Sequence, residues 1–80
     1  MLKWMKFLLK LNLKQQIILK EIIDKILSRN IEWLDIKKIS WKSNYYRCRT
    51  GKIRIIFYEE NWKYFIYDID FRWRIYRSLK

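Results

Sequence analysis

The chain has 80 residues, of which 19 are Lys or Arg and 8 are Asp or Glu, giving a formal net charge of +11 at pH 7. This length fits one domain, expected to span residues 1–80, and the 51% share of apolar residues excludes a disordered polar tail. A positive field of this size attracts nucleic acid or anionic lipid surfaces, and charge alone does not choose between them.

The composition argues against metal and nucleophilic sites, against a disulfide, and against a membrane-spanning or secreted protein. The chain contains no His, and Cys48 is its one cysteine, so metal clusters, nucleophilic triads and an intrachain disulfide lack their residues. No apolar run approaches the roughly 20 residues that span a bilayer, and the lysine-rich start lacks a signal-cleavage pattern. We therefore expect a cytoplasmic protein without metal, cofactor, membrane partner or small-molecule substrate.

The N-terminal half predicts two helices, over about residues 2–29. Apolar residues recur at helical spacing between Leu19 and Leu27, with charged residues on the opposite side. Asn12 followed by Gln15 resembles a capping box, so the longer helix should begin after Asn12 and end near residues 28–30. A shorter helix over about residues 2–11 precedes it. Together they predict a helical hairpin whose apolar stripe needs a sheet to cover it.

The C-terminal half predicts an antiparallel sheet of three to four strands, over about residues 44–77. Aromatic and β-branched residues dominate the segments 52–58 and 64–71. Thr50-Gly51 is a plausible two-residue turn, and Asn61 begins a second turn. The expected fold class is α+β, with the helical hairpin packed on one face of the sheet and the other face available.

Arginine is concentrated in the predicted sheet. Residues 1–40 contain eight Lys and one Arg, whereas residues 41–80 contain six Arg. A planar guanidinium binds phosphate with two hydrogen bonds, which favours the second half as the contact surface. A Thr50-Gly51 turn would pair Arg49 with Lys52 and Arg47 with Arg54. All four cations would then share one face of the sheet.

Two interpretations of this cationic face remain open. Like charges placed directly across a hairpin are destabilising, which favours an anion that neutralises them. The alternative is neutralisation within the sheet by Asp68, Asp70, Glu59 and Glu60. Among the chemistries that need neither His nor metal is RNA cleavage by the substrate's own 2′-hydroxyl, with the protein supplying position and positive charge.

Three segments resemble the RelE/ParE toxins. Residues 45–57, YYRCRTGKIRIIF, resemble the family pattern of tyrosine, arginine, x, arginine, x, glycine, x, x, arginine and an apolar strand. Residues 70–76, DFRWRIY, resemble its closing arginine and tyrosine, and residues 34–39 resemble its link between helix and sheet. The resemblance runs from about Leu11 to Arg77. It implies a RelE-like fold and a toxin of a type II toxin–antitoxin system, whose partners are a cognate antitoxin, the ribosome and mRNA.

The resemblance also implies roles for individual residues. Arg47, Arg49 and Arg54 would bind and neutralise the scissile phosphate. Arg72 would stabilise the leaving group, with Arg74 as a competitor for that role, and Tyr76 would stack on a base or assist proton transfer. This makes a catalytic set of Arg47, Arg49, Arg54, Arg72 and Tyr76. Further contacts with RNA are expected from Lys52, Arg74 and Arg77.

Family members usually open with a β-strand, whereas this chain starts almost directly in a predicted helix, so either that strand is absent or the start codon is misplaced. Its absence could expose a sheet edge that the C-terminal segment of the antitoxin covers by strand addition. The leading function is a ribosome-dependent mRNA endonuclease. The alternatives are a DNA gyrase inhibitor of the ParE branch and a degenerate, inactive toxin. A third alternative is membrane disruption, with Trp4, Phe7 and Leu8 inserting among anionic lipids.

The balance of glycine and tryptophan is unusual. Average usage of about 7% would give roughly six Gly, whereas the chain has one Gly and five Trp. Trp33, Trp41, Trp62 and Trp73 stand where glycine is favoured or where small residues are tolerated. One hypothesis is that UGA codons, which specify glycine in the source lineage, are read here as tryptophan. The alternative is genuine aromatic enrichment for stacking on bases.

Overall fold

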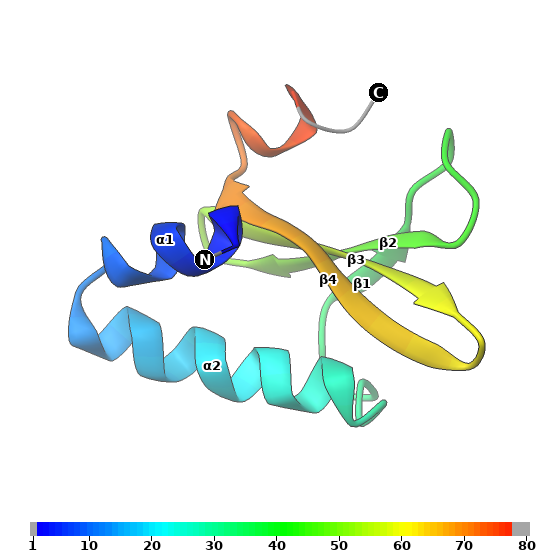
Figure 1. Ribbon diagram of the computed structural model, residues 1–80, viewed down its shortest axis with the longest axis horizontal. Helices are drawn as coiled ribbons and strands as arrows, with labels where there is room; N and C mark the ends of the chain where they lie inside the picture. Colours follow the sequence, from blue (N-terminus) through cyan, green and yellow to red (C-terminus); the bar gives the residue numbers. More distant parts are fainter. Residues whose placement is uncertain (1, 78–80) are drawn as a thin grey trace.

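A computed structural model describes residues 2–77. Two helices precede a four-stranded antiparallel sheet, which confirms the expected α+β class and RelE-like arrangement (Figure 1). The strands lie side by side in chain order, so β1 and β4 form the two edges. The elements are α1 (Lys3–Leu9), α2 (Leu13–Leu27), β1 (Ile36–Lys38), β2 (Tyr45–Thr50), β3 (Ile53–Glu60), β4 (Lys63–Phe71) and the 3₁₀ turn η1 (Ile75–Arg77).

The N-terminus of α2 is set by Asn12, as the sequence indicates. The Asn12 side-chain oxygen accepts a hydrogen bond from the backbone N–H of Gln15 at 2.8 Å. This bond satisfies one of the donors that every helix start leaves unpaired. The helix ends at Leu27, close to the expected boundary, whereas α1 is shorter than the predicted span of residues 2–11.

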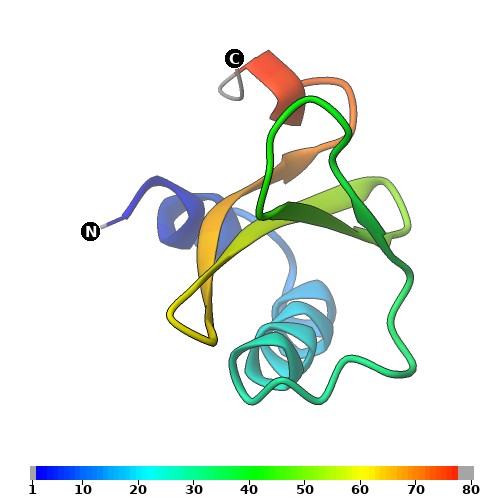
Figure 2. The same ribbon diagram turned by 90° about the vertical axis from the view of Figure 1, so that its right-hand side faces the viewer.

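Both helices cover the same face of the sheet, and the C-terminal turn lies over the opposite face (Figures 1 and 2). The buried side chains of α2 are Leu19, Ile23 and Ile26, which follow the apolar stripe read from the sequence. They pack with Phe7 of α1 against the apolar side of β2, β3 and β4. The strand residues in this main core are Cys48, Ile53, Ile55, Phe57 and Ile69.

The N-terminal segment is part of this core. Phe7 is 9% exposed and its ring meets Phe71 of β4 edge to face, with centroids 5.1 Å apart. Trp4 and Leu8 also pack against the core cluster. Membrane disruption by these side chains would require this packing to be undone, so the structure counts against that alternative.

The first strand lies earlier in the chain than the predicted start of the sheet, and it is only three residues long. The predicted sheet begins near residue 44, and residues 34–39 are read as a link, yet Ile36–Lys38 pair with β2 as the edge strand β1. Two of these three residues are Lys, which is depleted in strands, so no local strand signal exists. Pairing with β2 therefore decides the conformation of this segment.

The expected turn between β2 and β3 is displaced. Thr50 pairs with Ile53, so the connecting residues are Gly51 and Lys52 rather than Thr50 and Gly51. Gly51 has φ +59°, which glycine adopts without a steric penalty. The predicted pairs of Arg49 with Lys52 and Arg47 with Arg54 are therefore wrong.

The observed register places Arg49 opposite Arg54 and Arg47 opposite Ile56. The displacement is two residues, and side chains alternate with a period of two along a strand. For this reason the predicted division of the hairpin into a cationic face and an apolar face survives the error in register. Lys52 lies in the exposed turn, outside the ladder.

The turn between β3 and β4 consists of Asn61 and Trp62, with φ of 52° and 66°. Positive φ at both central residues is typical of a type I′ hairpin, which favours glycine at its second position. Trp62 is 82% exposed. Of the four tryptophans at suspected glycine positions, Trp62 alone has a positive φ. The backbone therefore favours glycine at position 62 and gives no such preference at the other three.

Replacing Trp62 with glycine is expected to stabilise the fold. A left-handed conformation costs an L-residue roughly 1–2 kcal/mol, partly offset by the greater chain entropy that glycine loses on folding. The Trp62→Gly variant should therefore raise the free energy of unfolding in urea by about 1 kcal/mol. Trp33→Gly is the matched control, because Trp33 is exposed and has no positive φ. Equal responses of the two variants would contradict this account of the turn.

Candidate functional site

The candidate site lies on the face of the sheet opposite the helices. A second, smaller core on this face consists of Ile39, Ile56 and Ile75. Ile75 belongs to η1 and is fully buried, so it anchors the C-terminal turn against β3. This anchoring brings Tyr76, which follows Ile75 in the chain, over the arginine-bearing strands. The face is thus partly covered, rather than wholly available as the sequence suggested.

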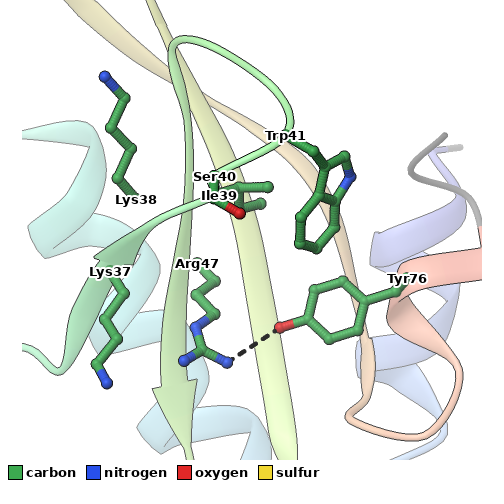
Figure 3. A pocket seen from close by; sticks show the side chains of 7 residues that line it. All are labelled: Lys37, Lys38, Ile39, Ser40, Trp41, Arg47 and Tyr76. Atoms are coloured by element: carbon green, nitrogen blue, oxygen red, sulfur yellow. Dashed lines mark hydrogen bonds between the residues drawn. The ribbon is translucent and has the colours of Figure 1, made fainter.

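Arg47 and Tyr76 are joined directly. Nη1 of Arg47 donates a hydrogen bond to the Tyr76 hydroxyl at 3.2 Å (Figure 3). Twenty-nine residues separate the two in the chain, and both side chains are partly buried. The hydroxyl accepts this bond, so its own proton is directed elsewhere. The pair therefore presents a fixed cation next to a hydroxyl donor.

Arg54 is the buried member of the cluster, with 6% exposure. Its Nη1 donates to the carbonyl oxygens of Gly51 at 2.7 Å and Ile53 at 3.0 Å, which braces the turn. Burial lowers the pKa of Arg54, and the charge of Arg49 lowers it further. Arg54 thus acts as a structural brace as well as a source of positive charge.

Arg47 and Arg72 also lower the pKa of Arg54, so four arginine charges repel one another in this region. Arg49 and Arg72 are exposed. The backbone N–H of Arg72 donates to the carbonyl of Lys52 at 2.8 Å, which holds the end of β4 against the turn. The structure therefore brings together residues from β2, β3 and the segment after β4 that are far apart in sequence.

Neutralisation within the sheet is partial. Asp70 lies opposite Arg54 in the ladder, but its Oδ1 accepts from Nε and Nη2 of Arg74 at 3.0 and 2.7 Å. Arg49 has a longer ion pair with Asp35, at 3.8 Å. Glu59 pairs with Arg29, outside the cluster. Within residues 2–77, no carboxylate lies within 4.0 Å of the guanidinium nitrogens of Arg47, Arg54 or Arg72.

The predicted RNA contacts are dispersed. Lys52 lies in the turn, Arg74 is paired with Asp70, and Arg77 is exposed on η1. Arg74 is therefore the least available of these cations, since its charge is already compensated. Its ion pair makes Arg72 the better candidate of the two for contact with a leaving group.

A cavity of about 350 Å³ adjoins the Arg47 and Tyr76 pair. The Trp41 ring meets the Tyr76 ring edge to face, with centroids 5.9 Å apart. Sequence reasoning gave no site role to Lys37 and Lys38, because it read β1 as a link. No sequence signal could have found Lys37, since only the pairing of β1 with β2 places it opposite Arg47. The lining residues are Lys37, Lys38, Ile39, Ser40, Trp41, Arg47 and Tyr76 (Figure 3).

Cys48 lies on the other side of the sheet, in the main core. Burial raises the pKa of its thiol to about 11, and the nearby Asp35 carboxylate adds to this effect. A thiol held protonated and enclosed is a poor nucleophile. Among residues 2–77, no three His, Cys, Asp or Glu side chains are grouped so as to hold a metal ion, and no helix is long and apolar enough to span a bilayer.

No protein-family model and no curated protein sequence matches the chain. Its structure is similar to a chain in the crystal structure of the RelB–RelE antitoxin–toxin complex from Methanococcus jannaschii, with a TM-score of 0.77 and 28% sequence identity. The match covers 96% of this chain and 93% of the other. Two helices on a four-stranded antiparallel sheet, with arginines on the far face, define a RelE-like α+β protein. This structural similarity confirms the resemblance to RelE/ParE toxins that the motifs of the chain indicate.

An anion that occupies the arginine cluster should stabilise the fold. Removing one charge by Arg49→Gln should relieve repulsion with Arg54, worth roughly 0.2–1 kcal/mol for a directly opposed pair, and should raise the melting temperature at low salt. Added polyphosphate, at matched ionic strength, should raise the melting temperature of this variant by less than that of the wild type. Lys14→Gln, at an exposed position of α2, is the control. Identical polyphosphate responses of wild type and Arg49→Gln would support neutralisation within the sheet.

Proposed function

We propose that this chain is the toxin of a toxin–antitoxin pair and acts as a ribosome-dependent mRNA endonuclease. The observation that carries the proposal is the hydrogen bond between Arg47 and Tyr76. Within residues 2–77, neither Arg47 nor the neighbouring Arg54 and Arg72 has a carboxylate ion-pair partner. A cluster of this kind suits a polyanion with a reacting phosphate. Similarity to a chain of an antitoxin–toxin complex supports the toxin–antitoxin part of this proposal.

The chemistry proposed is attack by the RNA's own 2′-hydroxyl on the adjacent phosphate. The bond from the 2′-oxygen to phosphorus forms as the bond from phosphorus to the 5′-oxygen breaks, leaving a 2′,3′-cyclic phosphate and a 5′-hydroxyl. The 2′-hydroxyl releases its proton to solvent water, and the departing 5′-oxygen takes one from the Tyr76 hydroxyl, which solvent then reprotonates. Negative charge grows on the phosphate oxygens, where preorganised cations are most effective.

Individual residues would serve these steps. Arg47 and Arg49 would neutralise the phosphate oxygens, with Arg54 adding positive charge from beneath and holding the turn. Arg72 would stabilise the departing oxygen. Tyr76 would donate its hydroxyl proton to the substrate, because the hydroxyl already accepts from Arg47. Since the chain has no His, alignment of the 2′-oxygen with the phosphate would depend strongly on how the ribosome presents the mRNA.

The antitoxin would be an acidic protein, because it must bind a chain with a net charge of +11. The outward sides of α1 and α2 expose large apolar side chains, including Leu9 at 62%, Leu13 at 71% and Ile17 at 59%. They line a groove of about 500 Å³ that Lys20 borders. An amphipathic acidic helix fits both features, since it buries apolar surface and pairs with lysine. The edge strand β4 remains a candidate for strand addition by the same partner.

Cleavage of a programmed mRNA in a purified translation system tests the enzymatic proposal. Wild type should cleave only when ribosomes are present. Tyr76→Phe keeps the ring and removes the hydroxyl, so it should lower the cleavage rate by about 100-fold or more if that group transfers a proton. Arg49→Ala should also lower it, whereas Lys25→Gln on α2 should not.

A folded wild type that cleaves no mRNA would overturn the nuclease assignment. A supercoiling assay with DNA gyrase would then separate the two remaining alternatives. Inhibition of gyrase would indicate the ParE-type activity, and its absence would indicate a degenerate toxin. Circular dichroism on each variant distinguishes loss of chemistry from loss of fold.

Antitoxin binding is tested at the helical groove. Leu13→Glu combined with Ile17→Glu should weaken binding of the acidic antitoxin by at least tenfold, because two apolar contacts become carboxylates that repel it. Cleavage by the variant should persist, since the groove lies on the helical layer. Trp33→Glu, also at an exposed apolar residue, should leave binding unchanged. Unchanged binding by the double variant would exclude the groove as the docking surface.

A further inference from the structure

Trp41 occupies a position that the proposed catalytic set does not explain. It lies in the connection between β1 and β2, and its side chain is 59% exposed. The second core is formed by Ile39, Ile56 and Ile75, without Trp41. Exposure alone does not distinguish this indole, since Trp33, Trp62 and Trp73 are exposed as well. The one described ring contact of Trp41 is with Tyr76, the aromatic residue of the candidate site.

The two rings form the aromatic part of the cavity beside Arg47. Their planes meet at 65°, so neither ring covers the other face to face. Figure 3 shows the rings next to each other and the Arg47 guanidinium reaching the Tyr76 hydroxyl. The cavity, at about 350 Å³, lies within the range of sites for small organic groups. A flat group placed there would contact an aromatic face with one part and a cation with another.

We propose that Trp41 and Tyr76 form a nucleobase subsite, which holds the base of a nucleotide next to the phosphate bound by Arg47. A nucleotide joins a planar aromatic base to an anionic phosphate, and the cavity offers a partner for each. Of its described lining residues none is acidic, and Lys37, Lys38 and Arg47 are cationic. This inference rests on the proposed function in taking single-stranded RNA as the ligand.

The backbone at position 41 does not require glycine. Trp62 adopts a positive φ that favours glycine, whereas Trp41 does not. The structure therefore separates the two positions: a glycine is favoured at 62 by the turn, and an aromatic side chain at 41 has a ring partner and a cavity. Stacking on such a side chain tolerates every base, because each base has an aromatic face.

The subsite is expected to affect affinity for RNA and the choice of cleavage position. Loss of a base–aromatic stack weakens binding by roughly 1–3 kcal/mol, which corresponds to about 5-fold to 150-fold in affinity. Purines should be held more strongly than pyrimidines, since they offer a larger ring surface. Contacts with phosphate alone should be independent of Trp41.

The test compares Trp41→Leu and Trp41→Phe in binding to a short single-stranded RNA whose 2′-hydroxyls are methylated to prevent cleavage. Fluorescence anisotropy of a labelled oligonucleotide reports affinity. Trp41→Leu should weaken binding about tenfold, and Trp41→Phe should retain most of it. Polyphosphate should bind all three proteins equally. Trp62→Leu, which removes an exposed indole from the β3–β4 turn, should bind RNA like the wild type.

Unchanged RNA affinity in Trp41→Leu would overturn the subsite, as would an equal loss of affinity for polyphosphate. The cleavage assay with ribosomes separates this inference from the nuclease proposal. Wild type that binds RNA through Trp41 but never cleaves mRNA would retain the subsite and refute the nuclease. If Trp41→Leu binds RNA with wild-type affinity and cleaves mRNA at the wild-type positions, the subsite is refuted and the nuclease proposal is retained.

Discussion

The pleat of the β2–β3 hairpin is the constraint on which both halves of the molecule depend. Alternate residues of these strands point to opposite faces, so Cys48 and Ile55 enter the main core while Arg47 and Arg49 lie on the other side. The helices bury the apolar face, and that burial fixes which face the arginines occupy. A slip of one residue would place guanidinium groups in the main core, where their desolvation would be prohibitive.

The opposite face combines stability with stored electrostatic repulsion. Ile56 lies between the arginines and is fully buried beneath Ile39 and Ile75, so this small core holds the C-terminal turn in place. The same packing delivers Tyr76 to Arg47. Arg54 lies close to other arginine charges and has a lowered pKa, chiefly because it is buried. A cluster of like charges is stabilised most when an anion binds, and this repulsion is the electrostatic basis of the proposed contact with phosphate.

Much of the fold could be predicted because its signals are local. The stripe from Leu19 to Ile26 defines α2, Asn12 defines its start, and runs of aromatic and β-branched residues define β3 and β4. The strand β1 could not be predicted, since Lys37 and Lys38 have no local preference for a strand and gain one only by pairing with β2. The turn at Gly51 was displaced for a related reason. Glycine marks the position of a turn, but cross-strand pairing decides whether Thr50 or Lys52 is its second residue.

The sequence by itself determined the α+β class, the excess of positive charge, the concentration of arginine in the C-terminal half and the family resemblance. These follow from composition and from periodicities of 2 and 3.6 residues, which are properties of short segments. Only the tertiary structure decided that Arg49 opposes Arg54, that Asp70 compensates Arg74, and that Tyr76 joins Arg47 and Trp41 around one cavity. Such contacts join residues far apart in the chain, and they depend on register and on how the C-terminal turn packs over the sheet, neither of which has a local signature.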